Sequence, residues 1–541
     1  MNWDIKQSFN YQKYMQDFSI HSLLAKILDI RGLEKEDVEK LLSPQLKYHD
    51  FSLFSDCDIA LDRIYEAIEN DEKICIYGDY DCDGILATAI LVQAFLELGK
   101  QVGYHIPHRK IDGYGLNVQR VQQMYEKGYS LIVTVDNGIK AFEAIDYAES
   151  LGIDVIVVDH HDFDELPNAC AIIHTKISPE YPFKEICGGF LAYKLASALL
   201  QKHDKYLFSL AAITTISDMM PLLDENRSLV KRALLFMEKE KYLPLELLLG
   251  ENQKYNVTNI GFIIAPKINS FGRLPEIVNP NHLVKFFLKN VDEKFALKIA
   301  AAAKSVNTKR QELTTAQYKT VLQNNESDDF LYVYNQDVHE GLVGLIAGKY
   351  TREFQKPSFV MCYDENNDCY KGSARSIAAI PLNEIFESLQ NDMMQYGGHA
   401  LAGGFTVAKN NIKKFENDIR DYLNSIVVEE EKLPVLLIKE EDISLTSIKE
   451  LELLEPFGQG NEDIFVMLEN VHVKSCRILS EGKHLRFDID MPYGTIQALK
   501  FNCPQLVDEY KNRKTISFVG KLKINKYLNK ESINMIIEDM K

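Results

Sequence analysis

The 541-residue sequence lacks long apolar runs and paired cysteines. No run approaches the roughly 20 apolar residues that cross a bilayer, and the first residues, MNWDIKQSFNYQKY, lack the apolar core of a secretory signal. The nine cysteines include no CxxC pair, so neither a zinc knuckle nor a thioredoxin-type site is expected. Their odd number and scattered spacing are typical of a reducing compartment. We therefore expect a soluble, cytoplasmic protein.

Two common catalytic motifs are also missing. The chain has no GxxxxGK(S/T) phosphate-binding loop and no HExxH zinc-protease helix. Positive charge is scarce, because 61 Lys and Arg stand against 79 Asp and Glu, a net charge of −18. Such an average argues against a nucleic-acid partner unless basic residues are concentrated in one region. The hydrophobic fraction of 46% is ordinary for a folded protein, and the length favours three or four domains.

Short β-branched runs alternate with helical segments in the first half of the chain. The runs are KICIYG (73–78), SLIVTVD (130–136), DVIVVD (154–159) and ACAIIHT (169–175). Residues 83–100 would form a helix with apolar side chains on most of its circumference, as in a buried helix. Strands this apolar are buried on both faces, so the pattern predicts an α/β domain with a parallel, doubly wound sheet.

The rest of the chain divides into regions of different character. Residues 282–324 contain neither Gly nor Pro, which predicts a long helix that connects two lobes. The charged break VVEEEKLP (427–434) is the best candidate for a linker. The predicted divisions are a helical lead-in (1–50), an α/β domain (51–281), a connecting helix (282–325), a mixed α/β domain (326–428) and a small antiparallel β-barrel (429–541).

The last region combines short strands with an excess of basic residues. Runs such as HLRFDID, GTIQALKF and SINMIIED are separated by turn residues, as in a small barrel. Residues 471–541 hold thirteen Lys and Arg against eight Asp and Glu, a net charge of +5. Phe518 and Tyr527 lie among these basic residues, as expected of a module that stacks the bases of single strands. An ordinary solvated charged face explains the pattern equally well.

Eight acidic and histidine residues follow the predicted strands or lie downstream of them. In chain order they are Asp79, Asp81, Asp83, Asp136, Asp159, His160, His161 and Asp218. The first three alternate directly after a strand, and in an extended chain their side chains would share one face. Because ligands of parallel sheets bind outside the carboxyl ends of the strands, we expect the groups to meet at one edge.

Crowded carboxylates repel one another, so a cluster of this kind needs cations. A helix cap at Asp83 explains one aspartate and not three. An EF-hand is excluded because no glutamate stands at loop position 12. Mixed carboxylate and imidazole ligands suit Mn²⁺ or a similar ion, and Mg²⁺ where oxygen ligands dominate. The number of candidate ligands predicts two ions, an arrangement that catalyses phosphoester displacement.

The motifs DYDCDG, VDNG, VDHH and SDMMPL occur in the order and approximate spacing of the DHH phosphoesterase superfamily, which the chain resembles. Other segments are similar to its RecJ family of single-stranded-DNA exonucleases: IPHRKIDGYGL (106–116), CGGFLAYKLA (187–196), IAPKINSFGRL (264–274), VHEGLVGLIAG (338–348), KGSARSI (371–377), GGHALAGGF (397–405) and LEPFGQGNED (454–463). The resemblance implies a DHH domain within 51–281, a DHHA1 domain within 326–428 and an OB-fold within 429–541.

The resemblance also implies roles for individual residues. Two Mn²⁺ or Mg²⁺ ions would be held by Asp79, Asp81, Asp83, Asp136, His160 and Asp218, with Asp136 between the ions. His161 would contact the scissile phosphate or assist proton transfer, and Asp159 would orient it. The residues that would face the DNA or its 5′ phosphate are Arg109, Arg273, Ser373 and Arg375. His399 is a further substrate-binding candidate, for which a structural role in its turn stays open.

The expected activity is a metal-dependent 5′→3′ exonuclease that releases 5′-mononucleotides from single-stranded DNA in repair and recombination. The resemblance implies single-stranded DNA as the partner, with a single-stranded-DNA-binding protein and a helicase as further partners. One alternative is a phosphodiesterase for short oligoribonucleotides or cyclic dinucleotides, but a dinucleotide has no length to fill a basic barrel. A non-catalytic single-strand-binding scaffold is the other, and the full set of acidic residues argues against it. The choice between Mn²⁺ and Mg²⁺ stays open.

Overall fold

A computed structural model describes residues 3–43, 45–323, 329–335, 337–426, 432–527 and 530–541. The chain forms two compact units. The first combines Met1–Lys47, Pro221–Arg227 and Glu430–Lys541, and the second combines Tyr48–Met220 with Ser228–Glu429. The predicted linker at 427–434 lies mostly outside the described residues.

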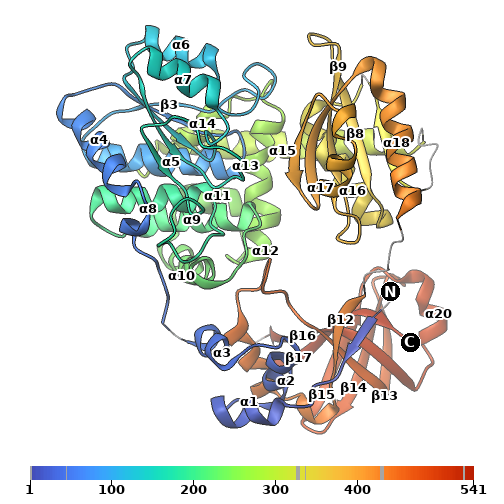
Figure 1. The fold of residues 1–541 in the computed structure, drawn as a ribbon. Coiled ribbons are helices and arrows are strands. Elements are labelled where there is room, and N and C mark those ends of the chain that lie inside the picture. Colours follow the sequence, from blue (N-terminus) through green and yellow to red (C-terminus); the bar gives the residue numbers. More distant parts are fainter. Residues whose placement is uncertain (1–2, 44, 324–328, 336, 427–431, 528–529) are drawn as a thin grey trace. The chain divides into compact units, whose positions relative to one another are not determined.

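The second unit begins with a five-stranded parallel sheet, which confirms the predicted fold class (Figure 1). Its strands are β2 (Ile74–Tyr77), β3 (Gly103–His105), β4 (Leu131–Val135), β5 (Asp154–Val158) and β6 (Ala171–Ile173). They lie in the order β3-β2-β4-β5-β6. The chain leaves β2 for β3 on one side and returns to β4 on the other, so the sheet has its topological switch point between β2 and β4. Ligands of open parallel sheets bind outside the carboxyl ends at such a point.

Helices cover both faces of this sheet (Figure 1). On one face, α6 (Val118–Glu126) and α7 (Phe142–Ser150) share a core with the strands. On the other, α5 (Cys82–Glu97) packs against β2 and β4, and α8 (Gly188–Leu200) packs against β4 and β5. The remaining helices before the connector are α4 (Cys57–Glu69), α9 (Lys205–Ser217), α10 (Asp224–Glu240), α11 (Leu243–Leu249), α12 (Val257–Asn259), α13 (Ala265–Arg273) and α14 (Asn281–Phe286).

The long connecting helix begins later than expected. The predicted helix from 282 is broken into α14 and α15 (Glu293–Gln323). Phe286 and Phe287 are both fully buried with their rings 4.9 Å apart, which turns the chain into the core between the two helices. Asp292 then starts α15, because its Oδ1 accepts a hydrogen bond from the Phe295 N–H at 2.9 Å.

A second sheet follows α15 in the same unit. Its order is β10-β11-β9-β8-β7, and only β7 and β8 run parallel. The strands are β7 (Leu331–Tyr334), β8 (Ser358–Asp364), β9 (Cys369–Arg375), β10 (Gln395–His399) and β11 (Ala402–Ala408). The helices packed on it are α16 (Val343–Phe354), α17 (Leu382–Ser388) and α18 (Ile412–Ser425).

The first unit contains the expected small β domain. Its strands are β12 (Leu433–Leu437), β13 (Phe465–Leu479), β14 (His484–Met491), β15 (Gly494–Lys500), β16 (Thr515–Tyr527) and β17 (Lys530–Met540). Five of them pair in the order β13-β14-β15-β17-β16, and β16 pairs with β13 as well. This pairing is consistent with the predicted barrel.

The N-terminal residues belong to the core of this β domain. They begin with the strand β1 (Trp3–Lys6), which pairs parallel with β12, and continue as α1 (Tyr11–Phe18), α2 (Ser22–Ile30) and α3 (Lys35–Leu42). The leucines of α2 pack in one cluster with Val466 and Phe487 of the barrel strands. Lys26 of α2 pairs with Asp442 at 2.5 Å. A segment expected as a lead-in is therefore structurally joined to a region more than 400 residues away.

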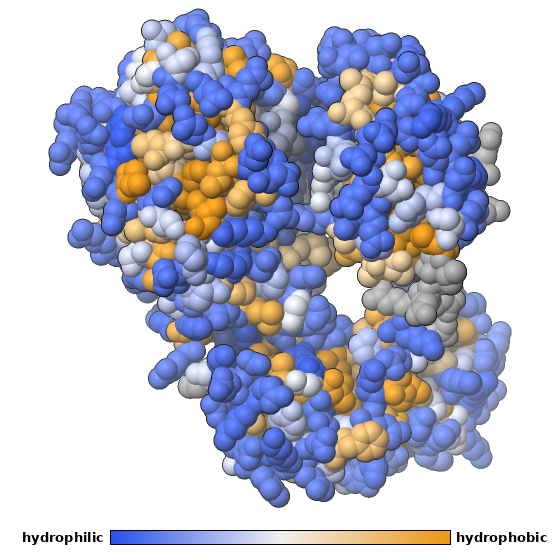
Figure 2. All heavy atoms as spheres, in the orientation of Figure 1, coloured by the Kyte–Doolittle hydropathy of each residue, from blue (hydrophilic) through white to orange (hydrophobic). Residues whose placement is uncertain are grey.

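No helix among the described residues is long and apolar enough to cross a membrane. On the face drawn in Figure 2, hydrophobic side chains form separate groups among hydrophilic ones.

We predict that Leu24→Ala loosens the barrel rather than the parallel sheet. Leu24 is fully buried in the core that joins α2 to the barrel strands, so truncation should destabilise the first unit by about 2–5 kcal/mol. Hydrogen exchange read by mass spectrometry should accelerate in β13 and β14 and stay unchanged in β2 and β4. Phe9→Ala is the control, because Phe9 is 78% exposed. Unchanged exchange in β13 with Leu24→Ala would contradict the packing.

Candidate metal centre

The three aspartates after β2 do not share one face of a strand, contrary to the expectation of an extended chain. The strand ends at Tyr77 and α5 begins at Cys82, so Asp79 and Asp81 precede the helix and Asp83 lies within it. Asp81 caps the helix by accepting a hydrogen bond from the Gly84 N–H at 3.1 Å, and Asp83 lies in the first turn. The turn is tight, since a Cβ at Gly84 would lie 2.4 Å from the Asp79 nitrogen. The helix start therefore directs the carboxylates toward different partners.

Asp79 and Asp81 form one group with Asp136, and one ligand atom of each lies within 4.8 Å of the others. Asp136 follows β4 with a φ of 60°, a left-handed conformation that Asp and Asn tolerate. Its N–H donates to the Val158 carbonyl at 3.0 Å, which fixes this conformation. Oδ1 of Asp79 is buried and has no hydrogen-bond partner among the described residues. A buried carboxylate oxygen without a donor fits a cation site.

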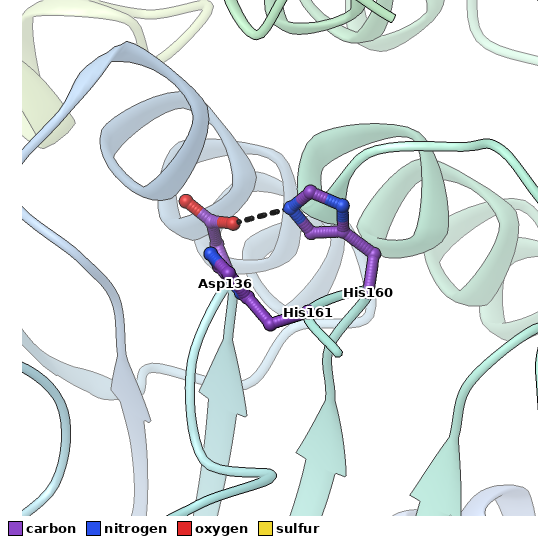
Figure 3. A group of neighbouring side chains, drawn as sticks. All are labelled: Asp136, His160 and His161. Carbon is purple, nitrogen blue, oxygen red and sulfur yellow. Dashed lines mark hydrogen bonds and ion pairs between the residues drawn. The ribbon is translucent and has the colours of Figure 1, made fainter. Parts of the chain in front are cut away.

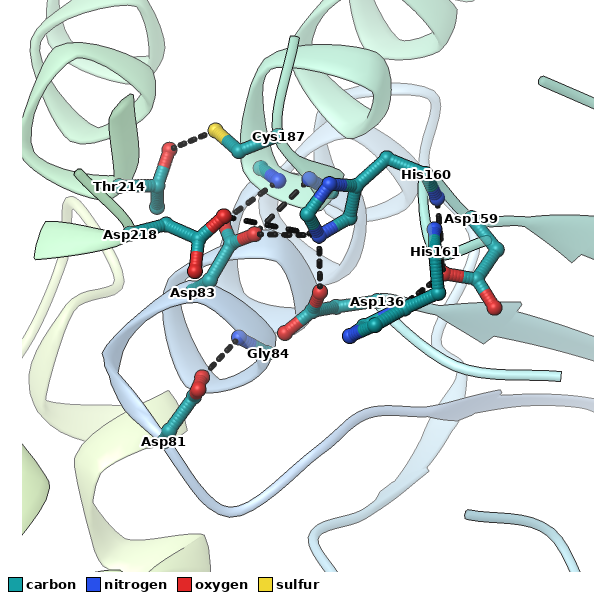
Figure 4. Close-up of polar contacts among 12 residues, drawn as sticks. Asp81, Asp83, Gly84, Asp136, Asp159, His160, His161, Cys187, Thr214 and Asp218 are labelled. Atoms are coloured by element: carbon teal, nitrogen blue, oxygen red, sulfur yellow. Dashed lines mark hydrogen bonds and ion pairs between the residues drawn. The ribbon is translucent and has the colours of Figure 1, made fainter. Parts of the chain in front are cut away.

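A second group consists of Asp83, His160 and Asp218 (Figure 4). Nε2 of His160 lies 3.8 Å from Asp83 Oδ2 and 3.6 Å from Asp218 Oδ2. Asp83 accepts hydrogen bonds from the Gly188 and Gly189 N–H groups at 2.8 and 2.7 Å, at the N-terminus of α8. Asp218 lies at the C-cap of α9, where the helix dipole disfavours a carboxylate. The N-terminus of α8 thus stabilises the charge of Asp83, whereas the C-terminus of α9 destabilises that of Asp218, which a bound cation would offset.

The two groups meet at Asp136 and His160 (Figure 3). Nε2 of His160 lies 3.2 Å from Asp136 Oδ1, and both residues form a third set with His161. The close approach of α8 depends on glycine, because a Cβ at Gly188 would lie 2.6 Å from the Asp136 Cβ. The six predicted ligands therefore lie together as two linked groups at the carboxyl edge of β2, β4 and β5.

Burial and mutual repulsion raise the pKa values of these carboxyl groups. Burial and then the charge of Asp81 raise the pKa of Asp79 to about 8 and that of Asp83 to about 6. The same two causes, burial first and then Asp83, raise the pKa of Asp136 well above its usual value. For His160, burial and the neighbouring His161 lower the pKa to about 3, so its imidazole is neutral and has a free lone pair. Bound cations would remove the repulsion and use this lone pair.

Asp159 and His161 form a separate pair beside the acidic groups. Asp159 is 1% exposed, and its Oδ1 lies 2.7 Å from His161 Nδ1. Its Oδ2 accepts a hydrogen bond from the Ile139 N–H at 3.0 Å. Burial acts to lower the pKa of His161, but the hydrogen bond and charge of Asp159 raise it to about 9. The geometry therefore holds a protonated imidazole in one orientation at the edge of the acidic groups.

Three predicted phosphate-binding arginines also come together, from three separate elements. The guanidinium of Arg109 lies 4.0 Å from the centre of the Tyr80 ring, Arg273 Nη1 donates to the Gly341 carbonyl at 3.2 Å, and Arg375 Nη1 donates to Ser373 Oγ at 2.7 Å. Burial and then the charges of neighbouring arginines, first of all Arg109, lower the pKa of Arg273 to about 9. Asp81 acts in the opposite direction, so the basic cluster adjoins the acidic one.

The structure pairs His399 with an acidic residue. Its side chain is 74% exposed, and its Nδ1 lies 3.4 Å from Asp162 Oδ2, in the loop that follows His161. Its charge nevertheless contributes to the low pKa of His160, so it lies in the neighbourhood of the metal ligands.

Several supporting residues were not predicted from the sequence. His174 is fully buried with Nε2 3.0 Å from the His161 carbonyl, and the Tyr114 hydroxyl lies 3.2 Å from His161 Nε2. Oδ1 of Asn269 accepts a hydrogen bond from the Cys82 N–H at 2.7 Å, which holds the start of α5. The Gly188-Gly189 pair lies in the segment CGGFLAYKLA, which the sequence comparison with the family had already singled out. The other contacts join residues far apart in the chain or residues of common type.

Three family models match separate parts of the chain. The DHH family, N-terminal domain, matches residues 73–217, the DHHA1 domain matches 327–425, and the RecJ OB domain matches 436–539. The described fold is similar to the crystal structure of RecJ in complex with Mn²⁺ from Thermus thermophilus, with a TM-score of 0.85 and 25% identity, over 100% of this chain and 79% of that one. The Mg²⁺ complex of the Thermus protein has the same fold, with a TM-score of 0.78 and 24% identity, over 100% of this chain and 78% of that one.

A sequence relative extends the match over the whole chain. The single-stranded-DNA-specific exonuclease RecJ of Bacillus subtilis (strain 168) is 32% identical over 558 residues, which cover 100% of this chain and 70% of that protein. The match therefore spans the segments that hold the acidic groups, the connector and the barrel. The chain therefore belongs to the RecJ family of single-stranded-DNA-specific exonucleases.

Proposed function

We propose that this chain hydrolyses single-stranded DNA from the 5′ end, with two Mn²⁺ or Mg²⁺ ions, and releases 5′-mononucleotides. One observation carries the proposal: an acidic cluster suited to cations adjoins an arginine cluster suited to a phosphate. Arg109 lowers the pKa of Asp79, and Asp81 raises that of Arg273, so the two clusters interact directly. An anion site beside the hydrolytic centre would hold the end of a strand next to the linkage that is cut.

The chemistry of the donors supports the metal assignment. The proposed ligands are Asp79, Asp81, Asp83, Asp136, His160 and Asp218, with Asp136 between the two ions. The unpaired Asp79 Oδ1 and the neutral imidazole of His160 are both available as ligands. Bound divalent cations would activate a water molecule and stabilise negative charge on the phosphate oxygens. The set of oxygens and one nitrogen suits either ion.

His161 is proposed to act on the substrate rather than on the metal. With Nδ1 held by Asp159, its Nε2 is the atom that can contact a scissile phosphate oxygen or donate a proton. Asp159 is proposed as the positioning group, since backbone N–H groups and His161 satisfy both of its oxygens.

The arginine cluster is proposed to bind the 5′-terminal phosphate. Arg109, Arg273 and Arg375 present planar donors that match phosphate oxygens, and Ser373 adds a hydroxyl. A 5′-terminal phosphate carries two negative charges, whereas an internal linkage carries one. The basic cluster would therefore bind the terminal phosphate more tightly, which would favour the 5′ end of the strand. His399 is proposed as a peripheral substrate contact.

The barrel is proposed to bind the strand farther from its end, but not through Phe518, one of the two aromatic residues expected from the sequence. Phe518 is fully buried against Phe487, with ring centres 5.3 Å apart, so it cannot stack on a base. The side chain of Tyr527 lies outside the described residues. Phe501 is the better candidate, because it is 48% exposed and follows Lys500 directly. Exposed aromatic and basic residues together are what single-strand binding requires.

Other parts of the expectation stay proposals. These are the domain limits 1–50, 51–281, 282–325, 326–428 and 429–541, the cytoplasmic location, a role in DNA repair and recombination, and binding to a single-stranded-DNA-binding protein or a helicase. The alternative activity on oligoribonucleotides or cyclic dinucleotides predicts turnover that does not depend on the barrel. Activity assays should therefore compare long single-stranded DNA with these short substrates.

We predict that Asp136→Asn abolishes hydrolysis of single-stranded DNA and leaves binding to it intact. Asparagine tolerates the left-handed backbone, so the change removes charge without new strain. The metal-free protein should melt at a higher temperature than the wild type, because a repelled carboxylate is gone. Saturating Mn²⁺, at about 100 times its Kd, should stabilise the wild type by about 2.7 kcal/mol and the variant by much less.

Differential scanning calorimetry with and without Mn²⁺, beside a timed nuclease assay, checks these outcomes. Asp164→Asn is the matched control, since Asp164 is an exposed carboxylate a few residues after His161. Turnover like that of the wild type in Asp136→Asn would refute the two-ion assignment.

Replacing Arg375 by Ala should reduce kcat/KM more for 5′-phosphorylated than for 5′-hydroxyl strands. A lost charge-assisted hydrogen bond costs about 1.5–3 kcal/mol, which is roughly ten- to hundredfold in kcat/KM. Lys371→Ala is the control on the same strand, because Lys371 is already paired with Asp364 at 2.7 Å. An equal loss with both ends would reassign Arg375 to general backbone binding.

Phe501→Ala should weaken binding of long single strands by about 1–3 kcal/mol per stacked base. The salt dependence should stay unchanged, because no charge is removed, whereas Lys483→Ala should reduce the slope of log affinity against log salt by about 0.7. Fluorescence anisotropy with the Asp136→Asn chain measures both without hydrolysis. Tyr493→Ala, at an exposed aromatic in the β14–β15 turn, is the control. Unchanged affinity with Phe501→Ala would remove this residue from the DNA-binding surface.

A further inference from the structure

A fourth arginine, Arg310 of the connecting helix α15, belongs to the basic cluster. Among the charges that lower the pKa of Arg273, that of Arg310 ranks after Arg109 and before Arg375. The two helices that carry them, α13 and α15, pack against each other. The cluster thus draws on the loop after β3, the end of α13, the middle of α15 and the end of β9.

None of these four arginines has an acidic side chain within 4.0 Å in the part of the chain that the structure describes. Arg310 donates only its Nε–H, to Asn307 Oδ1 at 3.1 Å, and its two Nη groups have no protein acceptor among the described residues. Its side chain is half-buried, and burial lowers its pKa. Neighbouring positive charges without an acidic side chain in contact repel one another, and a bound anion relieves that repulsion.

The number of donors exceeds what one terminal phosphate can accept. Each guanidinium presents a planar fork that fits two phosphate oxygens, and a terminal phosphate has three unbridged oxygens. The N–H donors of four guanidinium groups outnumber the acceptor sites of these three oxygens, which leaves further donors for a neighbouring phosphate of the strand. The Asn307 contact orients Arg310 by its Nε and leaves the terminal fork free for this purpose.

We propose that Arg310 is a substrate-binding residue that donates its Nη groups to a phosphate of the bound strand, beside Arg273. The proposal rests on the function proposed above and adds the connecting helix to the DNA-binding site. A structural role for Arg310 would require a protein acceptor for its terminal fork, and the described residues provide none.

Binding of short single strands by the full chain, made inactive by Asp136→Asn, tests the proposal. The probes are two strands of equal sequence, one with a 5′ phosphate and one with a 5′ hydroxyl. Arg310→Met should weaken at least one of them roughly ten- to hundredfold and reduce the salt slope by about 0.7. Loss with the 5′-phosphorylated strand alone assigns Arg310 to the terminal phosphate, and equal loss with both assigns it to an internal one. Either result supports the contact.

Lys309→Met is the matched control, because Lys309 is the exposed neighbour on the same helix, and it should bind both probes as the parent does. Wild-type affinity and salt slope of Arg310→Met with both probes would overturn the proposal. If Arg310→Met fails to fold by circular dichroism, Arg310→Gln is held to the same criterion. A wild-type chain that does not degrade single-stranded DNA would refute the proposed function alone, since this contact is measured by binding.

Discussion

Repulsion among buried carboxylates is the constraint on which the rest of this site depends. The strand order of the parallel sheet reverses between β2 and β4. At this switch point Asp79 and Asp81 lie beside Asp136. Other parts of the fold reduce the electrostatic repulsion at this site. The N-terminus of α8 donates two N–H groups to Asp83, and burial keeps His160 neutral. What remains is negative charge that only cations can balance, so structure and cofactor requirement have one cause.

A second concentration of charge, of opposite sign, lies next to the first. The arginines come from elements that are distant in sequence. Among them, Arg273 has the charge of Asp81 in its neighbourhood, which raises its pKa. A strand whose terminal phosphate enters the basic cluster would place its next linkage toward the acidic one. The distance between the clusters would then determine the length of the product, without recognition of any base.

Sequence patterns predicted the parallel strands, because β-branched runs are local signals. The acidic and histidine motifs gave eight candidate residues, and the family resemblance selected the six proposed ligands, which the structure brings together. Sequence patterns did not predict that α5 begins at Cys82, so that Asp81 precedes the helix and Asp83 lies in its first turn. The close approach of Gly84 to the Asp79 backbone is a tertiary contact that local patterns do not reveal. Nor did they identify Asn269, whose hydrogen bond to Cys82 spans 187 positions. The prediction for Phe518 was wrong. An aromatic residue among lysines suggested a base-stacking role, but the alternation of side chains along the strand places Phe518 in the core.

The same long-range packing decides which experiments on the barrel can be interpreted. Residues of α2 are buried against barrel strands, and β1 extends the sheet at β12. Removing Leu433 to Lys541 would therefore expose the apolar face of α2 and leave Lys26 without Asp442. Loss of DNA binding in such a truncation would report misfolding as readily as a missing surface. Point substitutions at exposed residues, such as Phe501 and Lys483, separate the two, because they leave the shared core unchanged.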